Sequence, residues 1–480
     1  MKYGSFCALF ACLAIVSVGR IAHAQQSFGG DSTAGSGVAG GAAGGAAMAD
    51  FDTLMNLIQQ TVDPDSWLAN GGGNSMLPYP AGVYVDPNGR LSRVEDVQFP
   101  ERSDASEPRH PWRQASTMRV VSLKAIDRAI AQAVQTGLKP SAELMNLAGL
   151  SKVSMVRIDL DHEDILLAGP ADGAAHGLQL EDLAVLAALI KTNTTPLGCS
   201  IDPEDDGIRA AQALLQEPGT LKRLARSPNM VVEQLEAAIG PHRVTVFGLP
   251  AQTGTALALV DADEHMKKVG FAKQRVRGGI DTYFDHVDAQ ASVPAESLVR
   301  WWFAYSDDPV LVSQGGDTFQ LPKNCVQVMS EKQWMTATGR QASPGNDAAA
   351  DAFAADFSKR IPKLRKQYPS YARLAAVFET ALALQLAVDA SGQSSLESWL
   401  PALCKVGQVR ESKLVEPKSV DGLATSHRLK SGTVLAVISG GVQIDPKRSA
   451  AKLQPSKFLA ESIVPSKPAQ PATTHGKWWW

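Results

Sequence analysis

The sequence predicts an α/β or α+β protein with a layered core, in which helices pack on a mixed sheet. The clearest observation is the segment 243–268, which reads as a buried strand, a polar turn and a helix. Thr253 suits the N-cap of that helix, and Gly270 suits its C-cap. The second observation is size and composition, because 480 residues with 44% hydrophobic side chains can fill about two or three domain cores.

The third observation is the order of elements in the segment 116–340, which we interpret as the α/β core domain. Helices and strands alternate there before a run of strands, an order that favours a layered core. Apolar periodicity predicts helices at 122–136, 180–191, 206–216 and 230–239, besides the one that begins near Thr253. Strands are predicted at 153–160, 164–168, 197–201, 297–305, 310–314 and 325–330, with a central strand around Val244 and Val246.

A second stretch of helical periodicity follows the core. It predicts a helical region at 347–405, interrupted near Pro362 and Pro369. Five basic residues between 359 and 366 suit a solvated helix surface better than an anion-binding face. The second helix of the region carries one apolar stripe, formed by Tyr371, Leu374, Ala375, Phe378 and Leu382.

Two shorter segments predict small folded pieces. Residues 50–97 read as a small module made of one helix and a hairpin, which turns at 86–89. Residues 406–445 read as a short β segment with strands at 433–439 and 442–444.

The segments between and beyond these pieces bury too little apolar surface to fold. We predict a disordered Gly/Ala-rich linker at 25–49, a second linker at 98–115 and a disordered tail at 446–480. Trp478, Trp479 and Trp480 close the tail. They suit a membrane interface or a partner surface, although a segment without folded support is more often simply mobile.

Residues 1–24 have the parts of a secretion signal. Lys2 supplies the positive start, residues 6–18 form the apolar stretch, and a small-x-small cleavage site ends at Ala24. We therefore expect export and a mature chain that starts at Gln25, with an uncleaved membrane anchor as the alternative. No later apolar run is long enough to span a bilayer, so we expect no transmembrane helix after cleavage.

Charge and motif content argue against several function classes. The formal net charge of −3 gives no overall field that favours nucleic acid. The sequence shows no dinucleotide fingerprint, Walker loop or Gly-x-Ser-x-Gly elbow, so no cofactor is expected. The partner stays open, with envelope or surface components as the expected class for an exported chain.

A few residues are candidates for acid–base chemistry. His286 could act as a general base that Asp285 orients, although a polar loop explains the same residues. Asp202 belongs to a group of acids before a predicted helix, where acids also simply stabilise the helix start. On the central helix, Asp263 and Lys267 read as an i, i+4 pair on the helix surface.

Asp159, Asp161 and Glu163 are the candidates for a metal site. They surround His162 and offer the oxygen ligands that calcium prefers. Their spacing lacks the glycine of the helix–loop–helix calcium site, and alternate acids on a strand also read as a solvated face.

Cys199, Cys325 and Cys404 remain after the predicted cleavage. They allow at most one internal disulfide and one free thiol, and the sequence does not choose the pair. Outside the cytoplasm such a bridge can persist, whereas the absence of a C-x-x-C pair in the sequence argues against structural zinc.

Several stretches match a known pattern together: 165–173 (ILLAGPADG), 178–183 (LQLEDL), 199–203 (CSIDP), Ala262-Asp263 with Met266-Lys267, Arg300-Trp301-Trp302-Phe303, and the helical region 353–388. In these stretches the chain resembles a family of secreted proteins of planctomycete bacteria that carry a domain of unknown function. The resemblance spans roughly residues 50–390. It implies a secreted protein with a core of several elements, and no activity, catalytic residue or cofactor.

Two hypotheses for function follow from the sequence. The first is a non-enzymatic exported protein, a binding or structural module of the cell envelope or surface. The alternative is an extracytoplasmic hydrolase of an unrecognised type that uses Asp, Glu and His residues of the core domain. The first is favoured because the sequence shows no recognisable catalytic motif.

Overall fold

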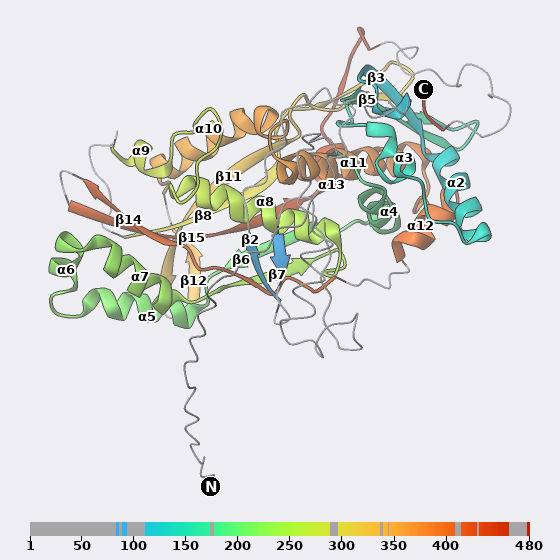
Figure 1. Ribbon diagram of the computed structural model, residues 1–480. Helices are drawn as coiled ribbons and strands as arrows, with labels where there is room; N and C mark the ends of the chain where they lie inside the picture. Colours follow the sequence, from blue (N-terminus) through green and yellow to red (C-terminus); the bar gives the residue numbers. More distant parts are fainter. Residues whose placement is uncertain are drawn as a thin grey trace, which may run out of the picture. The chain divides into compact units, whose positions relative to one another are not determined.

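The computed structural model describes residues 83–85, 89–93, 111–172, 177–288, 296–336, 339–343, 345–408, 414–429, 432–459 and 478–480 (Figure 1). They fall in the unit Phe51–Trp480. The predicted signal peptide, the linker at 25–49 and the helix that begins near residue 50 lie outside the described residues. The predicted fold class is confirmed, because helices and two mixed sheets pack around a shared core.

The larger sheet contains ten of the described strands, in the order β1-β2-β13-β7-β6-β15-β8-β11-β12, with β14 paired to β15. The predicted hairpin near residue 86 is present as β1 and β2, with Val83 opposite Arg93. The bounds are β1 (Val83–Val85), β2 (Arg90–Arg93), β6 (Leu197–Asp202), β7 (His242–Phe247), β8 (Glu296–Tyr305), β11 (Val326–Thr336), β12 (Gly339–Ala342), β13 (Ser419–Val420), β14 (Ala424–Leu429) and β15 (Gly432–Ile444).

β15 lies inside this sheet, between β6 and β8, and is the longest strand described. It runs parallel to β8, with Leu435 opposite Glu296. It runs antiparallel to β6, with Val442 opposite Cys199. The strands predicted at 433–439 and 442–444 form the single strand β15, and β13 and β15 complete the sheet of the predicted core domain.

The smaller sheet has the order β16-β9-β10-β4-β5-β3, and Trp479 pairs with Val121 on the free edge of β3. The predicted tail starts too early at residue 446, because α13 and β16 follow at once and Trp478 and Trp479 are buried. Residues 460–477 lie outside the described residues. The bounds are β3 (Ser116–Ser122), β4 (Met155–Asp159), β5 (Asp164–Ala171), β9 (Val310–Val312), β10 (Thr318–Gln320) and β16 (Leu453–Pro455).

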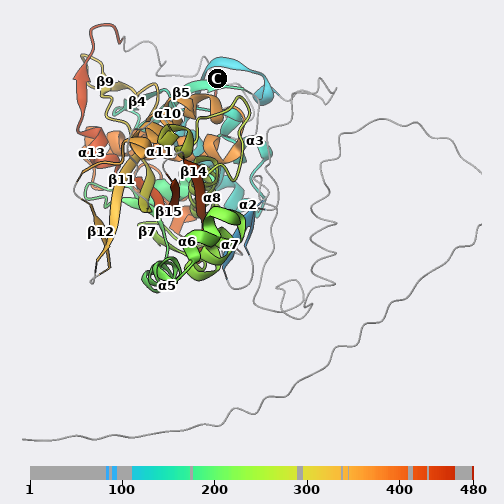
Figure 2. The ribbon, with the colours of Figure 1, turned by 90° about the vertical axis from the view of Figure 1, so that its left-hand side faces the viewer.

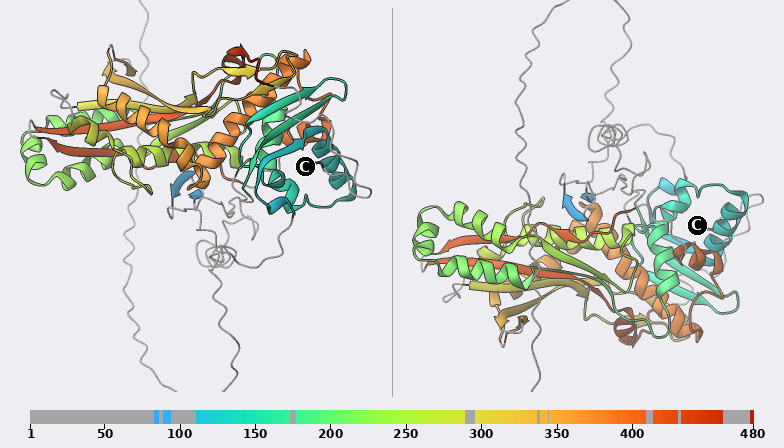
Figure 3. Two further views of the ribbon diagram at one scale, coloured as in Figure 1. Left: turned by 90° about the horizontal axis from the view of Figure 1, so that it is seen from above. Right: turned by 90° about the horizontal axis from the view of Figure 1, so that it is seen from below.

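Helices cover the larger sheet and connect it to the smaller one (Figure 3, with α10 and α11 in orange). α8 contacts β6, β15 and β8, while α10 contacts β8 and β11. Figure 2 shows α5, α6 and α7 gathered at one end, away from β4, β5 and β9. The helices are α2 (Leu123–Thr136), α3 (Ala142–Met145), α4 (Leu180–Leu189), α5 (Asp205–Gln216), α6 (Thr220–Arg226), α7 (Pro228–Ile239), α8 (Gly254–Gly270), α9 (Tyr283–Asp288), α10 (Ala348–Leu364), α11 (Pro369–Ser391), α12 (Pro401–Gln408) and α13 (Pro446–Ala450), with 3-10 turns at η3 (Pro111–Arg113) and η4 (Leu147–Gly149).

α11 is buried on every side along most of its length, not on the single stripe predicted for it. Every residue from Pro369 to Val388 is buried, because α4, α8 and β4 all pack against the helix. By length and composition alone α11 could cross a membrane, but its burial fits a core helix. The helical region predicted at 347–405 contains α10, α11 and most of α12, and it packs into the core. Pro362 lies within α10, and Pro369 begins α11.

The two caps predicted for the central helix α8 have different outcomes. Thr253 is confirmed as the N-cap, since its hydroxyl accepts a hydrogen bond from the Ala256 N–H at 3.0 Å. The prediction for Gly270 is wrong, because Gly270 is still helical and Phe271 follows as the C-cap. A Cβ atom at Gly270 would lie 2.9 Å from the Phe353 ring and closer still to the Trp301 ring. Gly270 therefore serves the packing of α8 on β8 and α10.

We expect Gly270→Ala to lower the free energy of unfolding by about 1–3 kcal/mol, the usual cost of overpacking a core. Alanine alone would favour the helix by roughly 0.5–1 kcal/mol, so a net loss would reveal the clash. Trp301→Phe in the same chain should relieve part of the clash and make the two changes non-additive. Urea unfolding of the single and double variants measures this, and a Gly270→Ala chain more stable than the wild type would contradict it.

Candidate functional site

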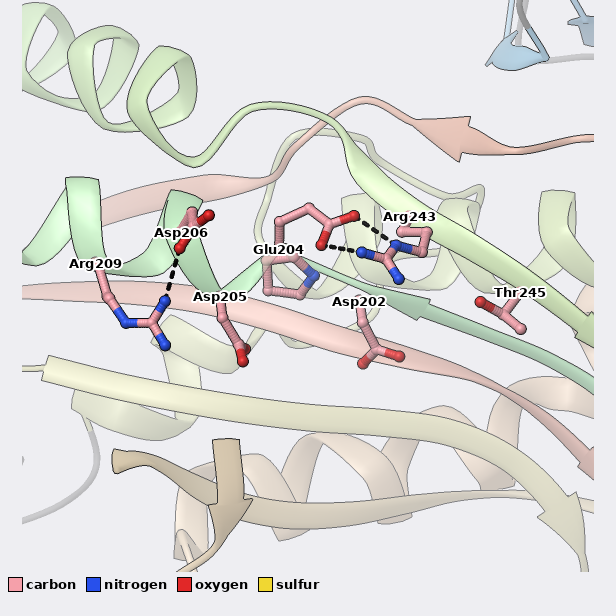
Figure 4. Close-up of a pocket in the computed structure, with 8 residues that line it drawn as sticks. Asp202, Glu204, Asp205, Asp206, Arg209, Arg243 and Thr245 are labelled. Atoms are coloured by element: carbon pink, nitrogen blue, oxygen red, sulfur yellow. Dashed lines mark hydrogen bonds and ion pairs between the residues drawn. The ribbon is translucent and has the colours of Figure 1, made fainter. Parts of the chain in front are cut away.

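A polar pocket of about 330 Å³ lies where β6 ends and α5 begins (Figure 4). Its walls come from the end of β6, the turn that follows, the first turns of α5, and the neighbouring strand β7. Asp202, one of the acid–base candidates, is among the lining residues. The lining consists of Asp202, Pro203, Glu204, Asp205, Asp206, Arg209, Arg243 and Thr245.

The pairing of β6 with β7 brings these side chains together. Asp202 stands opposite Arg243, and Ser200 stands opposite Thr245. Residues directly opposite each other in an antiparallel pair point to the same face of the sheet. Cys199 alternates with them and is buried on the other face. The pocket therefore lies on the face of the larger sheet opposite to α8.

Two ion pairs cross the pocket (Figure 4). Arg243 binds both carboxylate oxygens of Glu204, with its Nε 2.5 Å from Oε1, and this hydrogen bond raises the pKa of Arg243. Arg209 lies 2.7 Å from a carboxylate oxygen of Asp206. The four side chains are 46% to 97% exposed, so water screens their attraction. The pocket thus offers a ligand both carboxylates and guanidinium groups in a solvated setting.

A buried ion pair on α8 lies against the other face of β6, although the sequence predicted it on the helix surface. Lys267 Nζ lies 2.6 Å from Asp263, and both side chains are at most 1% exposed. The Gly441 N–H donates to Asp263 at 2.8 Å, and Lys267 donates to the Ile201 carbonyl at 3.3 Å. A Cβ on Gly440 would lie 2.6 Å from the Lys267 side chain and closer still to the Trp301 carbonyl oxygen, which explains the glycine there. The Gly-Gly pair in β15 was the one sequence signal that could have shown this contact.

A second buried cluster joins α4, α8 and α11, and the sequence analysis missed it. Arg373 donates from Nε to both carboxylate oxygens of Asp182, at 3.2 and 3.0 Å, and from Nη2 to Glu181 at 3.1 Å. The Thr255 hydroxyl donates to Asp182 at 2.7 Å, and the Gly254 N–H donates to Glu181 at 2.9 Å. These partners are far apart in the sequence, so no local pattern could reveal them.

Residues 199–283 match the model of a protein family of unknown function, DUF1598. The chain carries a DUF1598 domain. It runs from β6 to the start of α9, and so includes the pocket and the Asp263–Lys267 pair. The expected domain of unknown function is thus present, over a narrower range than the resemblance covers. No curated protein and no solved structure matches the chain.

His286 and Asp285 lie just past the DUF1598 domain and do not form the expected pair. Asp285 caps α9 instead, since its carboxylate accepts from the Thr282 N–H and hydroxyl, both at 2.7 Å. The His286 ring nitrogen Nε2 lies 3.5 Å from Asp356 on α10. Neither residue lines the pocket that contains Asp202, so the three acid–base candidates do not converge.

The acidic loop between β4 and β5 holds its own protein partners. Asp159 accepts from the His162 N–H at 3.1 Å and lies 2.9 Å from its ring, and Glu163 pairs with Lys124 at 2.8 Å. Asp161 lies in the exposed turn. Among the described residues, no three His, Cys, Asp or Glu side chains gather in a way that could hold a metal ion. Glu163 therefore braces the start of α2, while Asp159 holds His162 within the loop.

The three cysteines named as disulfide candidates do not pair with one another in the structure, where each is a free and buried thiol. Cys199 lies in β6, Cys325 donates to the Pro322 carbonyl, and Cys404 on α12 donates to the Ala187 carbonyl. Each thiol is thus packed in a separate place. Burial raises the pKa of all three, that of Cys404 to about 12.

We expect none of these thiols to react with a water-soluble thiol reagent in the folded protein, and all three to react in urea. The raised pKa values keep the three thiols protonated, so their reactivity in the folded protein should stay low from about pH 7 to pH 9. An ordinary cysteine, with a pKa of about 8.5, ionises and becomes reactive over the same range. A spectrophotometric thiol count with Ellman's reagent measures this. A count of one in urea without reductant would instead demonstrate a disulfide.

We expect Lys267→Met to lower the free energy of unfolding by about 3–5 kcal/mol, because it leaves the Asp263 carboxylate buried without its partner. Burial already raises the pKa of Asp263. In the variant, the folded state should bind a proton more tightly than the unfolded state, so stability should fall as pH rises from 5 to 8. Urea unfolding at both pH values tests this.

The matched control is Lys359→Met, which breaks an exposed i, i+3 pair with Asp356. This change should cost less than about 1 kcal/mol and show no such pH dependence. Adding Asp263→Asn to Lys267→Met should recover part of the loss. Equal effects of the two lysine variants would show that the buried pair has no special role.

Proposed function

We propose that the protein is exported and acts as a non-enzymatic binding or structural module of the cell envelope or surface. The leader pattern at residues 1–24 and the resemblance to secreted planctomycete proteins support export. The DUF1598 domain supplies the binding surface, which is the face of the larger sheet that bears the pocket.

The observation that carries the proposal is the division of charged groups between the two faces of β6. On the α8 face, Asp263 and Lys267 are buried and pair with each other. On the pocket face, Arg243 and Glu204 are exposed and available to a polar ligand. Acid–base catalysis uses groups whose protonation is tuned by a shared, partly buried site. The buried charged groups Asp263 and Lys267 instead hold α8 on the larger sheet.

A hydrolase is the second candidate, and one observation favours it. Asp202 and Asp205 line the same pocket, and Figure 4 shows their carboxylates extending in the same direction. Two carboxylates in one pocket are the minimum for acid–base hydrolysis of a polar substrate. The lining residues include no histidine, so such an enzyme would depend on these acids alone.

A sedimentation experiment separates the two candidates. The mature protein, from Gln25 onward, should co-sediment with the envelope fraction of its own source in a saturable way. We expect Asp202→Asn with Arg243→Gln to weaken this binding at least tenfold, since each removes a charge from the pocket. Glu233→Gln, an exposed acid on α7, is the control and should leave binding unchanged.

Two outcomes would count against the proposal. Release of soluble fragments from the envelope by the wild type, lost in Asp202→Asn, would support the hydrolase. An intact leader on a protein recovered from the cytosol, shown by N-terminal sequencing, would exclude export.

A further inference from the structure

Trp478, Trp479 and Trp480 pair through backbone hydrogen bonds with the free edge of β3. The Val120 N–H donates to the Trp480 carbonyl and the Trp480 N–H donates to the Val120 carbonyl, both at 3.0 Å. The Ser122 N–H donates to the Trp478 carbonyl at 2.9 Å. Trp479 stands opposite Val121 in an antiparallel bridge. Figure 1 places the label C beside β3, in agreement with these contacts.

The Trp479 side chain contacts two charged residues beside β3. The Arg119 guanidinium lies 4.4 Å from the centre of the Trp479 ring, a cation–π contact, and the Trp479 indole N–H donates to Glu143 on α3. Arg119 is itself 4% exposed and donates to the carbonyls of Trp112 and Gln114 at 2.6 and 3.1 Å. Arg119 is therefore held in place by groups other than the three tryptophans.

We define the β3 edge groove as Arg119, Val120, Val121, Ser122 and Glu143. Its chemistry selects an extended segment with a tryptophan at the central position, because it offers strand hydrogen bonds, a cation above the ring and an acceptor for the indole N–H. Addition of a strand to a sheet edge is a common mode of peptide recognition. Residues 460–477 separate the last described residue of the core, Leu459, from Trp478.

We propose that the β3 edge groove also accepts Trp478, Trp479 and Trp480 of a second copy of the chain, which links copies by strand exchange. Every copy carries both the groove and the segment that fits it. Docking between two copies makes the same contacts as docking within one copy. The concentration of copies therefore sets the balance between the two states. The spacer fixes the effective concentration of the chain's own segment, on the order of millimolar for short linkers. Crowding of copies on a surface would shift the balance toward exchange.

A complementation experiment with two variants of the full mature chain tests this. The acceptor is Trp478→Ala, Trp479→Ala and Trp480→Ala together, which empties the groove and removes the segment. The donor is Val120→Pro, which removes the N–H that meets Trp480 and leaves the pairing of Val121 with Leu167 on β5 in place. Glu143→Lys is a second donor, should the proline variant fail to fold.

Neither variant should associate with itself, whereas an equimolar mixture should form a 1:1 heterodimer in sedimentation velocity. A labelled peptide of residues 475–480, HGKWWW, should bind the acceptor and dissolve the heterodimer. Its alanine counterpart, HGKAAA, should bind at least tenfold more weakly. The wild type should bind little of the peptide, since its own segment fills the groove.

The outcomes are decisive in both directions. A folded acceptor that binds neither peptide would show that the three tryptophans have only a local structural role. Peptide binding without a heterodimer from either donor, at concentrations that saturate the acceptor with peptide, would overturn the exchange between copies. These results do not depend on the pocket, so they are distinguishable from a failure of the proposed envelope binding.

Discussion

The buried pair of Asp263 and Lys267 fixes how α8 lies on the larger sheet, and the rest of the core is arranged around α8. Charges removed from water are tolerated only when they are paired and hydrogen-bonded. Here the partners are the Gly441 N–H and the Ile201 carbonyl, one from each of two adjacent strands. Sliding α8 by one turn would break both hydrogen bonds to the strands at once. The pair therefore sets the register of the helix on β6 and β15 more sharply than apolar contacts could.

Buried ion pairs also hold α11 against its neighbours. Arg373 on α11 binds Asp182 on α4, and Arg365 binds Glu379 at 2.5 Å, whose other oxygen accepts from the Val153 N–H at 3.0 Å. The Arg373–Asp182 and Glu379–Val153 contacts join elements that are far apart in the chain. An apolar helix such as α11 packs well in several rotations, so such polar contacts help to select one of them. The charged residues of the interior thus specify the arrangement of the core.

The sequence predicted what is encoded locally and failed where distant partners decide. The Thr253 cap and the strand and helix positions from residue 122 to residue 247 depend on near neighbours, and they agree with the structure to within a few residues. α6 was missed, because its seven residues show little apolar periodicity. Gly270 was misassigned because a glycine that ends a helix and a glycine that admits a tryptophan ring look alike in sequence. β15 was placed in a separate segment because its partners, β6 and β8, lie far back along the chain.

The candidate site also depends on contacts between distant residues, which the sequence did not predict. Asp202 was singled out for its charge, and it does line a pocket, but the pocket exists only because β7 pairs with β6. Asp285 and His286 are neighbours in sequence, yet their side chains serve different partners, Thr282 and Asp356. Composition could show that the three tryptophans lacked a core of their own, but not that β3 ends the smaller sheet with an open edge. The open edge of β3 alone would leave backbone N–H and C=O groups unpaired, and the three tryptophans alone would leave aromatic rings exposed. Their pairing satisfies the backbone groups and buries the rings of Trp478 and Trp479. Because this contact adds to an already closed core, it is among the first that local opening can release.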